Sequence, residues 1–508
     1  MASLAALVPL ACVAVLGSCV LRPAVSASPS SNAWAAQTDY LVLQPAVVAA
    51  AALQHQQQLI VAAAHQSRAA FEKLAQLTDG IGHRLSGSAG LTRALQWAAD
   101  TMRADGHANV HIEPVMVPHW VRGPASALAT SSVRGALPRQ LHVLALGGSV
   151  AGDVTGRVLV VKSWDELEQR KADVAGAIVL FNVAMPAWTK AHGSGYGDVV
   201  GYRVGAARAA AKLGAAAVLM RSVTAHSLGT LHTGSMSYAD DVAKIPAATI
   251  TVEDATWLQR TTASGATITV RLQLQTEQLP DAASGNVIAE LRGSVWPDEI
   301  VVLAAHIDSW DVGQGAHDDG AGCVIMMQAL TTLRQLHLTP KRTIRVVLYT
   351  NEENGVRGAR QYALDHVKEL GHHVAAIESD SGGFAPTGFA LEVASGTPLA
   401  QQQRVQQRAR ALVTAAGRVG AGRVTLGYAG TDIEPLIEAR VPGFGLTVDN
   451  RTYFDIHHSD ADTLDKVDPA QLADGVAAVA ALAYGLAQAS ERLLPERLPP
   501  LASTGTAP

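Results

Sequence analysis

The chain has 508 residues, of which 48% are hydrophobic and 16% are charged, and its formal net charge is −5. This length indicates two or three domains, with ample apolar residues for a stable core. The 39 Lys and Arg residues form no basic stripe, which argues against a nucleic-acid-binding protein, because neutralising phosphates needs clustered positive charge.

The N-terminal residues contain an uncharged apolar run, residues 4–21, that approaches the length of a membrane span. We interpret it as an export signal that is cleaved after residues 25–27, a Val-Ser-Ala sequence of small residues. The sequence thus predicts a signal peptide over residues 1–27 and an exported protein, secreted or periplasmic, with no stable membrane span in the mature chain. Lipidation at Cys19 and an uncleaved anchor remain as alternatives.

Cysteine usage fits an exported protein without disulfide bonds. The chain has 3 Cys, and two of them, Cys12 and Cys19, lie in the predicted signal peptide. Cys323 is then alone in the mature chain, and a protein of this size needs no disulfide to be stable. Because Cys323 lies in an apolar helical stretch, we expect it to pack in the core rather than to act as a nucleophile.

The segment after the signal peptide predicts a linker followed by helices. Residues 28–39 are rich in Ser, Ala and Asn, as flexible linkers are. Residues 44–76 have the apolar spacing of a helix, and residues 90–105 indicate an amphipathic helix. Residues 110–117 then have the pattern of a strand.

The sequence pattern changes from about residue 126, where short apolar runs alternate with Gly and Asp. The expected strands are 141–146, 157–161, 177–181, 216–220, 247–252 and 267–273, and the expected helices are 204–213 and 255–262. This pattern predicts a small α/β insert that ends near residue 281.

Strand and helix patterns alternate regularly from residue 285 onward. The expected strands are 286–290, 300–305, 343–349, 374–377, 389–393 and 443–448, and the expected helices are 321–336 and 469–494. Residues 343–349 are rich in β-branched side chains, which is typical of a strand buried on both faces. The β-α-β order predicts an α/β fold with a mostly parallel central sheet flanked by helices. Residues 495–508, rich in Pro, Ser and Thr, predict a disordered tail.

His, Asp and Glu residues follow the predicted strands of this last part. They are His306, Asp318 and Asp319, Glu352 and Glu353, Asp380, and His457 and His458. Each alone has an ordinary explanation as a loop, turn or surface residue. Together they are expected to meet at one edge of the sheet, where open α/β sheets bind their ligands. Two imidazoles and three carboxylates suit a pair of divalent ions such as zinc, one carboxylate can bridge the two ions, and a fourth is left to act as a base.

Five segments in chain order resemble those of the carboxypeptidase Q family of di-zinc metallopeptidases. These segments are residues 306–320, 350–355, 377–382, 384–388 and 457–463, and residues 79–86 and 118–123 resemble the front of the same catalytic domain. The resemblance covers residues 40–490, and it implies a di-zinc exopeptidase fold with an inserted protease-associated α/β domain. It divides the chain into a catalytic domain of two parts, residues 40–125 and 285–494, with the insert over residues 126–284.

The resemblance also implies roles for individual residues. It makes His306, Asp318, Glu353, Asp380 and His458 the ligands of two zinc ions, with Asp318 bridging them, Glu352 the general base, Asp308 a residue that orients His306, and His457 a group near the oxyanion. We expect Asp319 to be a turn residue. His317 departs from the family pattern, and we expect it in an exposed loop.

The implied activity is zinc-dependent hydrolysis of short peptides, mainly dipeptides, by a homodimer. An aminopeptidase acting on longer peptides is an alternative, because the sequence does not reveal which peptide terminus is recognised. Asp432 is a candidate for contacting a free amino group, or else the N-cap of a helix. Two further alternatives are a non-catalytic binding protein on the same fold, which the complete set of ligands and Glu352 argues against, and a single-zinc cyclising or deacylating enzyme.

Overall fold

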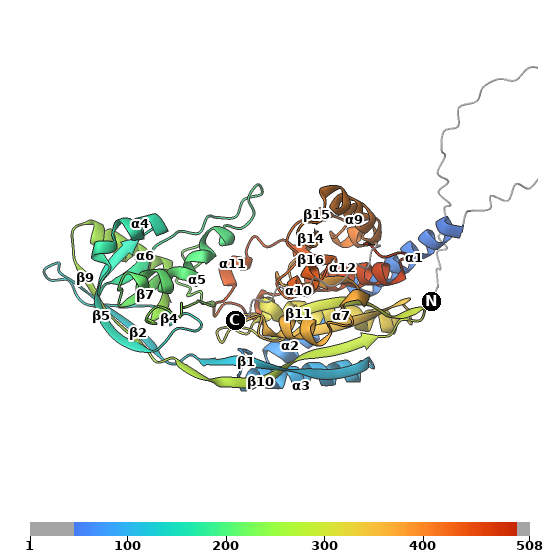
Figure 1. The fold of residues 1–508 in the computed structure, drawn as a ribbon, viewed down its shortest axis with the longest axis horizontal. Helices are drawn as coiled ribbons and strands as arrows, with labels where there is room; N and C mark the ends of the chain where they lie inside the picture. Colours follow the sequence, from blue (N-terminus) through green and yellow to red (C-terminus); the bar gives the residue numbers. More distant parts are fainter. Residues whose placement is uncertain (1–44, 495–508) are drawn as a thin grey trace, which may run out of the picture. The chain divides into compact units, whose positions relative to one another are not determined.

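The computed structural model describes residues 45–494 (Figure 1). The predicted signal peptide, linker and tail lie outside the described residues. The described residues from Ala49 onward belong to one compact unit, and it contains all the features that follow.

The first of two eight-stranded sheets carries the strand ends of interest. Its order is β1 (Ala108–Val121), β10 (Glu277–Leu291), β12 (Arg342–Tyr349), β11 (Trp296–His306), β13 (His373–Glu378), β16 (Gly443–Val448), β14 (Pro386–Glu392) and β15 (Val424–Leu426). The four central strands, β12, β11, β13 and β16, are parallel to one another. The prediction of alternating strands and helices is therefore confirmed for the centre of the sheet.

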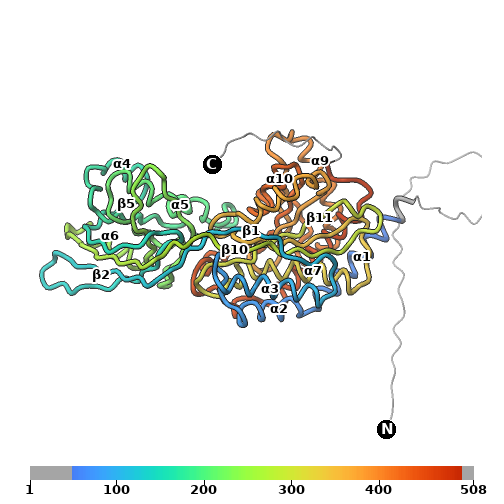
Figure 2. The backbone as a smooth tube through the Cα atoms, turned by 60° about the horizontal axis from the view of Figure 1, so that its bottom comes forward, coloured from blue at the N-terminus to red at the C-terminus, as the bar shows by residue number. Residues whose placement is uncertain are grey.

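The sheet as a whole is mixed rather than mostly parallel, which corrects the prediction from the sequence. β1 and β10 pair antiparallel over most of their length, β10 is antiparallel to β12, and β14 is antiparallel to β16. The cause at the β1 edge is the insert, because the chain leaves the sheet through β1 and returns through β10 (Figure 2). Two strands that carry the chain out and back side by side must run in opposite directions.

Helices cover both faces of the first sheet. They are α1 (Pro45–His65), α2 (Ala69–Thr78), α3 (Ala89–Ala104), α7 (Ala321–Gln335), α8 (Arg357–Asp365), α9 (Leu399–Leu412), α10 (Glu434–Glu438) and α12 (Pro469–Gln488). The short helix α11 (Tyr453–Ile456) instead packs through Phe454 against residues between β1 and β10. In β11, Val301 and Leu303 pack with α2, α3, α7 and α12, whereas Val302 and Ala304 pack with α8 and α10. This alternation buries both faces, as the sequence of the neighbouring strand β12 predicted.

The helices test three predictions from the sequence, concerning residues 44–76, residues 469–494 and Cys323. The single helix expected over residues 44–76 is two helices, since α1 ends at His65 and α2 begins at Ala69. Between them, the Ser67 hydroxyl accepts a hydrogen bond from the Ala69 amide at 3.2 Å. Among the described helices, α12 alone is long and apolar enough to cross a membrane, and most of it is buried inside the fold. Cys323 on α7 is also fully buried, which confirms its expected place in the core.

The second sheet lies between β1 and β10 in the sequence. Its order is β3 (Arg139–Leu141), β2 (Ala125–Ser131), β9 (Ile268–Leu274), β5 (Gly152–Val161), β6 (Ile178–Phe181), β7 (Ala217–Arg221), β8 (Ala247–Ile250) and β4 (Val143–Ala145), with helices α4 (Trp164–Gln169), α5 (Tyr196–Lys212) and α6 (Val252–Ala263). The sequence predicted most of these strands, and its assignment of the insert to the protease-associated type stays a prediction.

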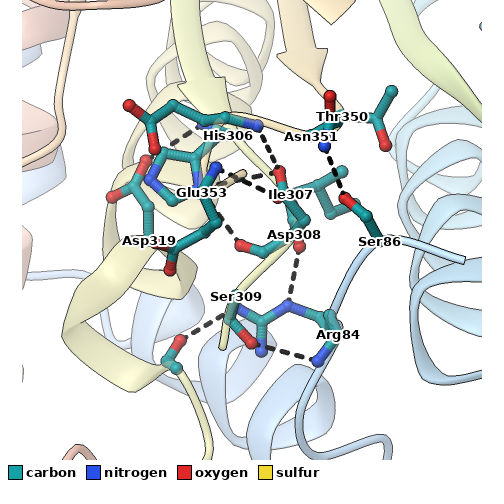
Figure 3. Close-up of polar contacts among 12 residues, drawn as sticks. Arg84, Ser86, His306, Ile307, Asp308, Ser309, Asp319, Thr350, Asn351 and Glu353 are labelled. Atoms are coloured by element: carbon teal, nitrogen blue, oxygen red, sulfur yellow. Dashed lines mark hydrogen bonds and ion pairs between the residues drawn. The ribbon is translucent and has the colours of Figure 1, made fainter. Parts of the chain in front are cut away.

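Arg84 ties the loop after α2 to the loop that follows β11 (Figure 3). Its guanidinium is fully buried and donates to four carbonyl oxygens, those of Gly82, Ile307, Gln314 and Gly315, at 2.7–3.1 Å. These bonds fix the chain that leads to Asp318 and α7. Burial lowers the pKa of Arg84, since no carboxylate makes a direct ion pair with it in the described chain.

We expect Arg84→Met to lower the free energy of unfolding by about 3–5 kcal/mol, because buried carbonyl groups lose a charged donor. Urea denaturation monitored by circular dichroism measures this loss. Arg93→Met is the matched control, since Arg93 lies exposed on α3 and makes only a 3.3 Å bond to the Ile81 carbonyl; it should cost no more than about 0.5 kcal/mol. Equal losses in the two variants would contradict the structural role of Arg84.

Candidate metal centre

The predicted site residues come from the carboxyl ends of the central parallel strands. His306 is the last residue of β11, Glu353 follows β12, and Asp380 follows β13. Asp318 lies in the turn Ala316–Gly320 that begins α7, and His458 lies just after α11. Parallel neighbours end at the same edge of a sheet, so five segments meet at one place.

Asp318 stands between two groups of side chains. Its Oδ1 lies 3.3 Å from His306 Nε2, which in turn lies 3.3 Å from Asp380 Oδ1. Its Oδ2 lies 3.1 Å from His458 Nε2, which lies 3.1 Å from Glu353 Oε2. Four of the five residues expected to hold metal therefore surround the carboxylate of the fifth, Asp318, which offers one oxygen to each group.

The chemistry of these groups fits divalent cations. Asp318 Oδ2 is buried and lacks a hydrogen-bond partner of suitable geometry in the described chain. Burial and the neighbouring Asp318 carboxylate raise the pKa of Glu353 to about 7, and burial also raises the pKa of Asp380. Crowded, buried carboxylates next to imidazoles need a positive charge among them, and zinc takes these ligand types.

Asp308 supports the centre in two ways (Figure 3). Its carbonyl oxygen lies 3.1 Å from His306 Nδ1, which favours the tautomer with a proton on Nδ1 and leaves Nε2 to bind metal. Its carboxylate accepts the backbone amides of Glu352 and Glu353 at 3.1 and 3.3 Å. The sequence predicted the first role, and the second is visible only in the structure.

We expect Asp308→Ala to weaken zinc binding by about 10- to 100-fold, because the backbone of Glu352 and Glu353 loses its acceptor. Competition with a calibrated zinc chelator measures the affinity. Asp240→Ala, in an exposed loop, is the control and should bind zinc like the parent protein. An unchanged affinity in Asp308→Ala would show that the backbone holds its position without this carboxylate.

Asp319 lies in the turn Ala316–Gly320, as predicted, whereas His317 differs from its predicted setting. Asp319 is fully buried; its Oδ1 accepts the Gly322 amide at 3.0 Å and its Oδ2 the His306 amide at 3.2 Å, so it joins the start of α7 to the end of β11. His317, expected in an exposed loop, is also fully buried, and that prediction is wrong. Its ring stacks on Phe384 with centroids 4.2 Å apart, and burial lowers its pKa to about 4.

Asp462 holds the turn before α7 in its buried position. Its two carboxylate oxygens accept the backbone amides of His317 at 2.7 Å and Asp318 at 3.1 Å. Burial raises the pKa of Asp462 to about 7. No role was predicted for Asp462 from the sequence, because the contact joins positions 145 residues apart.

His457 lies directly beside His458 and close to Asp318, two of the predicted ligands. The two rings stack with centroids 3.5 Å apart, and His457 Nε2 is 3.4 Å from Asp318 Oδ2. His458 has a φ of 57°, a left-handed conformation that is unusual outside glycine and found at functional sites. His458 contacts both Asp318 and Glu353, whereas His457 contacts Asp318 alone among these carboxylates.

The centre opens onto a cavity of about 490 Å³. Glu352 lines it as a half-buried side chain that makes no hydrogen bond to another residue in positions 45–494. Elements of the second sheet contribute part of the wall, through Tyr196 and Arg203 of α5. A substrate in this cavity would contact both parts of the chain.

Asp432 is not a helix N-cap, since α10 begins at Glu434 after Ile433 and has no side-chain cap. Asp432 is buried, and neither of its carboxylate oxygens has a hydrogen-bond partner in the described chain. Neighbouring Glu378, which the sequence analysis missed, accepts the Ile433 amide at 2.9 Å. Burial raises the pKa of Glu378 to about 8. Contact of Asp432 with a free amino group stays a prediction.

Comparison with known proteins agrees with this arrangement. Residues 286–483 match the model of Peptidase family M28. Carboxypeptidase Q of Mus musculus is 40% identical over 434 residues, which cover 84% of this chain and 87% of the mouse protein. The chain belongs to the carboxypeptidase Q group of peptidase family M28. It is a metallo-exopeptidase, as its sequence predicted.

Two solved structures are similar to this chain in fold. The crystal structure of a peptidase M28 precursor from Shewanella amazonensis has a TM-score of 0.82 at 34% identity and covers 89% of this chain and 100% of that chain. A zinc aminopeptidase from Bacillus subtilis has a TM-score of 0.59 at 20% identity and covers 84% of this chain and 96% of that one. The structural similarity therefore extends beyond the residues that match the family model and includes residues of the second sheet.

Proposed function

We propose that this M28 peptidase hydrolyses short peptides, chiefly dipeptides, with two zinc ions. His306 and Asp380 would hold one ion, Glu353 and His458 would hold the other, and Asp318 would bridge them. The observation that carries this proposal is the position of Asp318, whose two oxygens face separate donor groups. The name of the Bacillus subtilis zinc aminopeptidase, which shares the fold, supports the choice of metal.

Glu352 is the acid–base residue in this proposal. Zinc in such a site makes a water molecule acidic near neutral pH and polarises a carbonyl group. A carboxylate oxygen of Glu352 takes the proton of the attacking water and then delivers it to the nitrogen of the leaving amine. Glu352 suits this task because its side chain belongs to neither donor group and faces the cavity.

His457 and Asp308 assist these steps. Asp308 holds the backbone of Glu352, so the carboxylate stays beside the cavity as the proton moves. The His457 ring, packed on His458, lines the cavity and in this proposal would contact the carbonyl oxygen of the scissile bond. Burial lowers the pKa of His457 well below its usual value.

Mass spectrometry of a dipeptide and tripeptide panel tests this function directly. We expect dipeptides to be hydrolysed, a chelator to stop the reaction, and added zinc to restore it. The reactivated protein should contain two zinc ions per chain. Removal of single N-terminal residues from longer peptides would instead identify an aminopeptidase. A protein that binds no zinc and splits no peptide would contradict the proposal.

Export and self-association complete the proposal. We infer a secreted or periplasmic protein that begins near residue 28 and forms a homodimer. N-terminal sequencing of the protein from its native source tests the cleavage site, and sedimentation equilibrium tests the dimer. An uncleaved N-terminus or a monomer would contradict these two points separately.

A further inference from the structure

Arg203 is the only Lys or Arg among the described residues that line the catalytic cavity. Four carboxylates from the first sheet line the same cavity: those of Asp318, Glu352, Glu353 and Asp380. Arg203 lies on α5, which belongs to the same part of the chain as the second sheet (Figure 1). The rings of Tyr196 on α5 and Phe454 on α11 stack with centroids 4.5 Å apart. The cavity therefore has one cationic position in an otherwise acidic wall.

The Arg203 guanidinium has no carboxylate partner in the described chain. The residue is only 5% exposed. Its Nε donates to the Ser235 carbonyl at 3.3 Å and its Nη1 to the Thr233 carbonyl at 3.4 Å, both long bonds to neutral acceptors. Its Nη2 makes no hydrogen bond to residues 45–494. Nη2 is not one of the buried atoms left without a partner, so it is open to the cavity and free to donate to a ligand carboxylate.

The surroundings of Arg203 are shaped for the guanidinium. A Cβ at Gly234, whose φ is 140°, would lie 2.3 Å from Arg203 Cζ, so this loop must have glycine there. The Tyr196 ring lies beneath the guanidinium at 5.7 Å and contacts the His457 ring with centroids 5.2 Å apart. Arg203 and His457 thus flank one aromatic ring.

The loop around Arg203 is also bonded to the metal-centre histidines. The Thr233 amide donates to the His458 carbonyl at 2.9 Å, and His232 Nδ1 lies 2.7 Å from the His457 carbonyl. These contacts fix the position of the guanidinium relative to the predicted ligands. Arg203 is therefore held in a fixed position in the cavity wall.

We propose that Arg203 binds the free C-terminal carboxylate of the substrate, an inference that rests on the proposed peptidase function. A peptide carboxylate can pair with a guanidinium through two parallel hydrogen bonds, and Arg203 is the one Lys or Arg side chain that lines this cavity in the described chain. Arg203 then places the C-terminal residue on the leaving-group side of the scissile bond. The substrates are peptides whose free carboxylate lies one residue beyond that bond, and C-terminal amides are poor substrates.

The test compares one dipeptide with its C-terminal carboxamide. We expect the parent enzyme to favour the acid by about 100-fold in kcat/KM, since the amide leaves Arg203 unpaired. Arg203→Met should lower kcat/KM for the acid about 100-fold and change that for the amide less than about threefold. Arg203→Lys keeps the positive charge but not the planar guanidinium, so its kcat/KM for the acid should lie between those of the parent enzyme and Arg203→Met. Arg208→Met, on the exposed side of the same helix, is the control and should match the parent enzyme.

Equal parent kcat/KM values for acid and amide would overturn the inference, as would an equal loss for both substrates in Arg203→Met. Thermal unfolding identifies a variant that fails to fold, in which case Arg203→Lys decides. Calorimetric binding of a reduced-bond dipeptide analogue, as acid and as amide, gives a readout independent of turnover. The two proposals can fail separately. If the parent protein hydrolyses no peptide but binds the acid analogue more tightly than the amide analogue, and Arg203→Met loses this preference, the proposed function is wrong and the carboxylate site remains supported.

Discussion

Glu352→Gln is expected to lower kcat about 10³-fold while both zinc ions stay bound. The amide cannot take a proton from water or return one to the leaving amine, so the variant loses its general base. The metal should remain, because the Glu352 side chain contacts neither Asp318 nor the imidazoles, whereas Glu353 lies 3.1 Å from His458. Steady-state kinetics on a dipeptide and zinc analysis by atomic emission measure the two quantities.

Glu438→Gln, an exposed change of the same kind, is the matched control and should retain full activity. Loss of zinc from Glu352→Gln would show that Glu352 is a ligand, and the roles assigned to the two adjacent glutamates would be wrong. Loss of activity with full zinc content is the result that separates a base from a ligand.

Asp318→Ala is expected to leave at most one zinc ion per chain and to lower kcat/KM at least about 10³-fold. Both donor groups share this carboxylate, so its removal takes one oxygen from each. Asp318→Asn keeps the size of the side chain but not its charge, and it should also lose metal, since zinc prefers a charged bridging oxygen here. Zinc analysis after gel filtration measures the content.

Asp460→Ala serves as the control for Asp318→Ala, because Asp460 is exposed and lies in the loop just after His458. It should bind two ions. Two ions in Asp318→Ala would contradict the bridge and would place the metals elsewhere in the fold.

The centre of the fold could be predicted from the sequence because its strands are buried on both faces. Residues 343–349 were expected as such a strand, and β12 spans Arg342–Tyr349 with every residue buried. The edges could not be predicted in the same way. The direction of β10 depends on where the chain re-enters after the insert, and that is a property of the whole topology.

The gathering of site residues at one edge could be predicted because strand ends and turns appear directly in the sequence. His306 and Asp318 were expected together and lie 3.3 Å apart. Burial of His317 could not be predicted, because it depends on Asp462, 145 residues further along the chain. Arg203 could not be predicted for the same reason, because it lines the cavity through the packing of α5 against α11, which is distant in the sequence.

Anomalous diffraction at the zinc edge, from crystals of the zinc-loaded protein, tests the central claim most directly. We predict two peaks, each about 2.0–2.2 Å from one oxygen of Asp318. One peak should lie against His306 and Asp380, and the other against Glu353 and His458. A single peak, or two peaks of which neither contacts Asp318, would contradict the two-metal account.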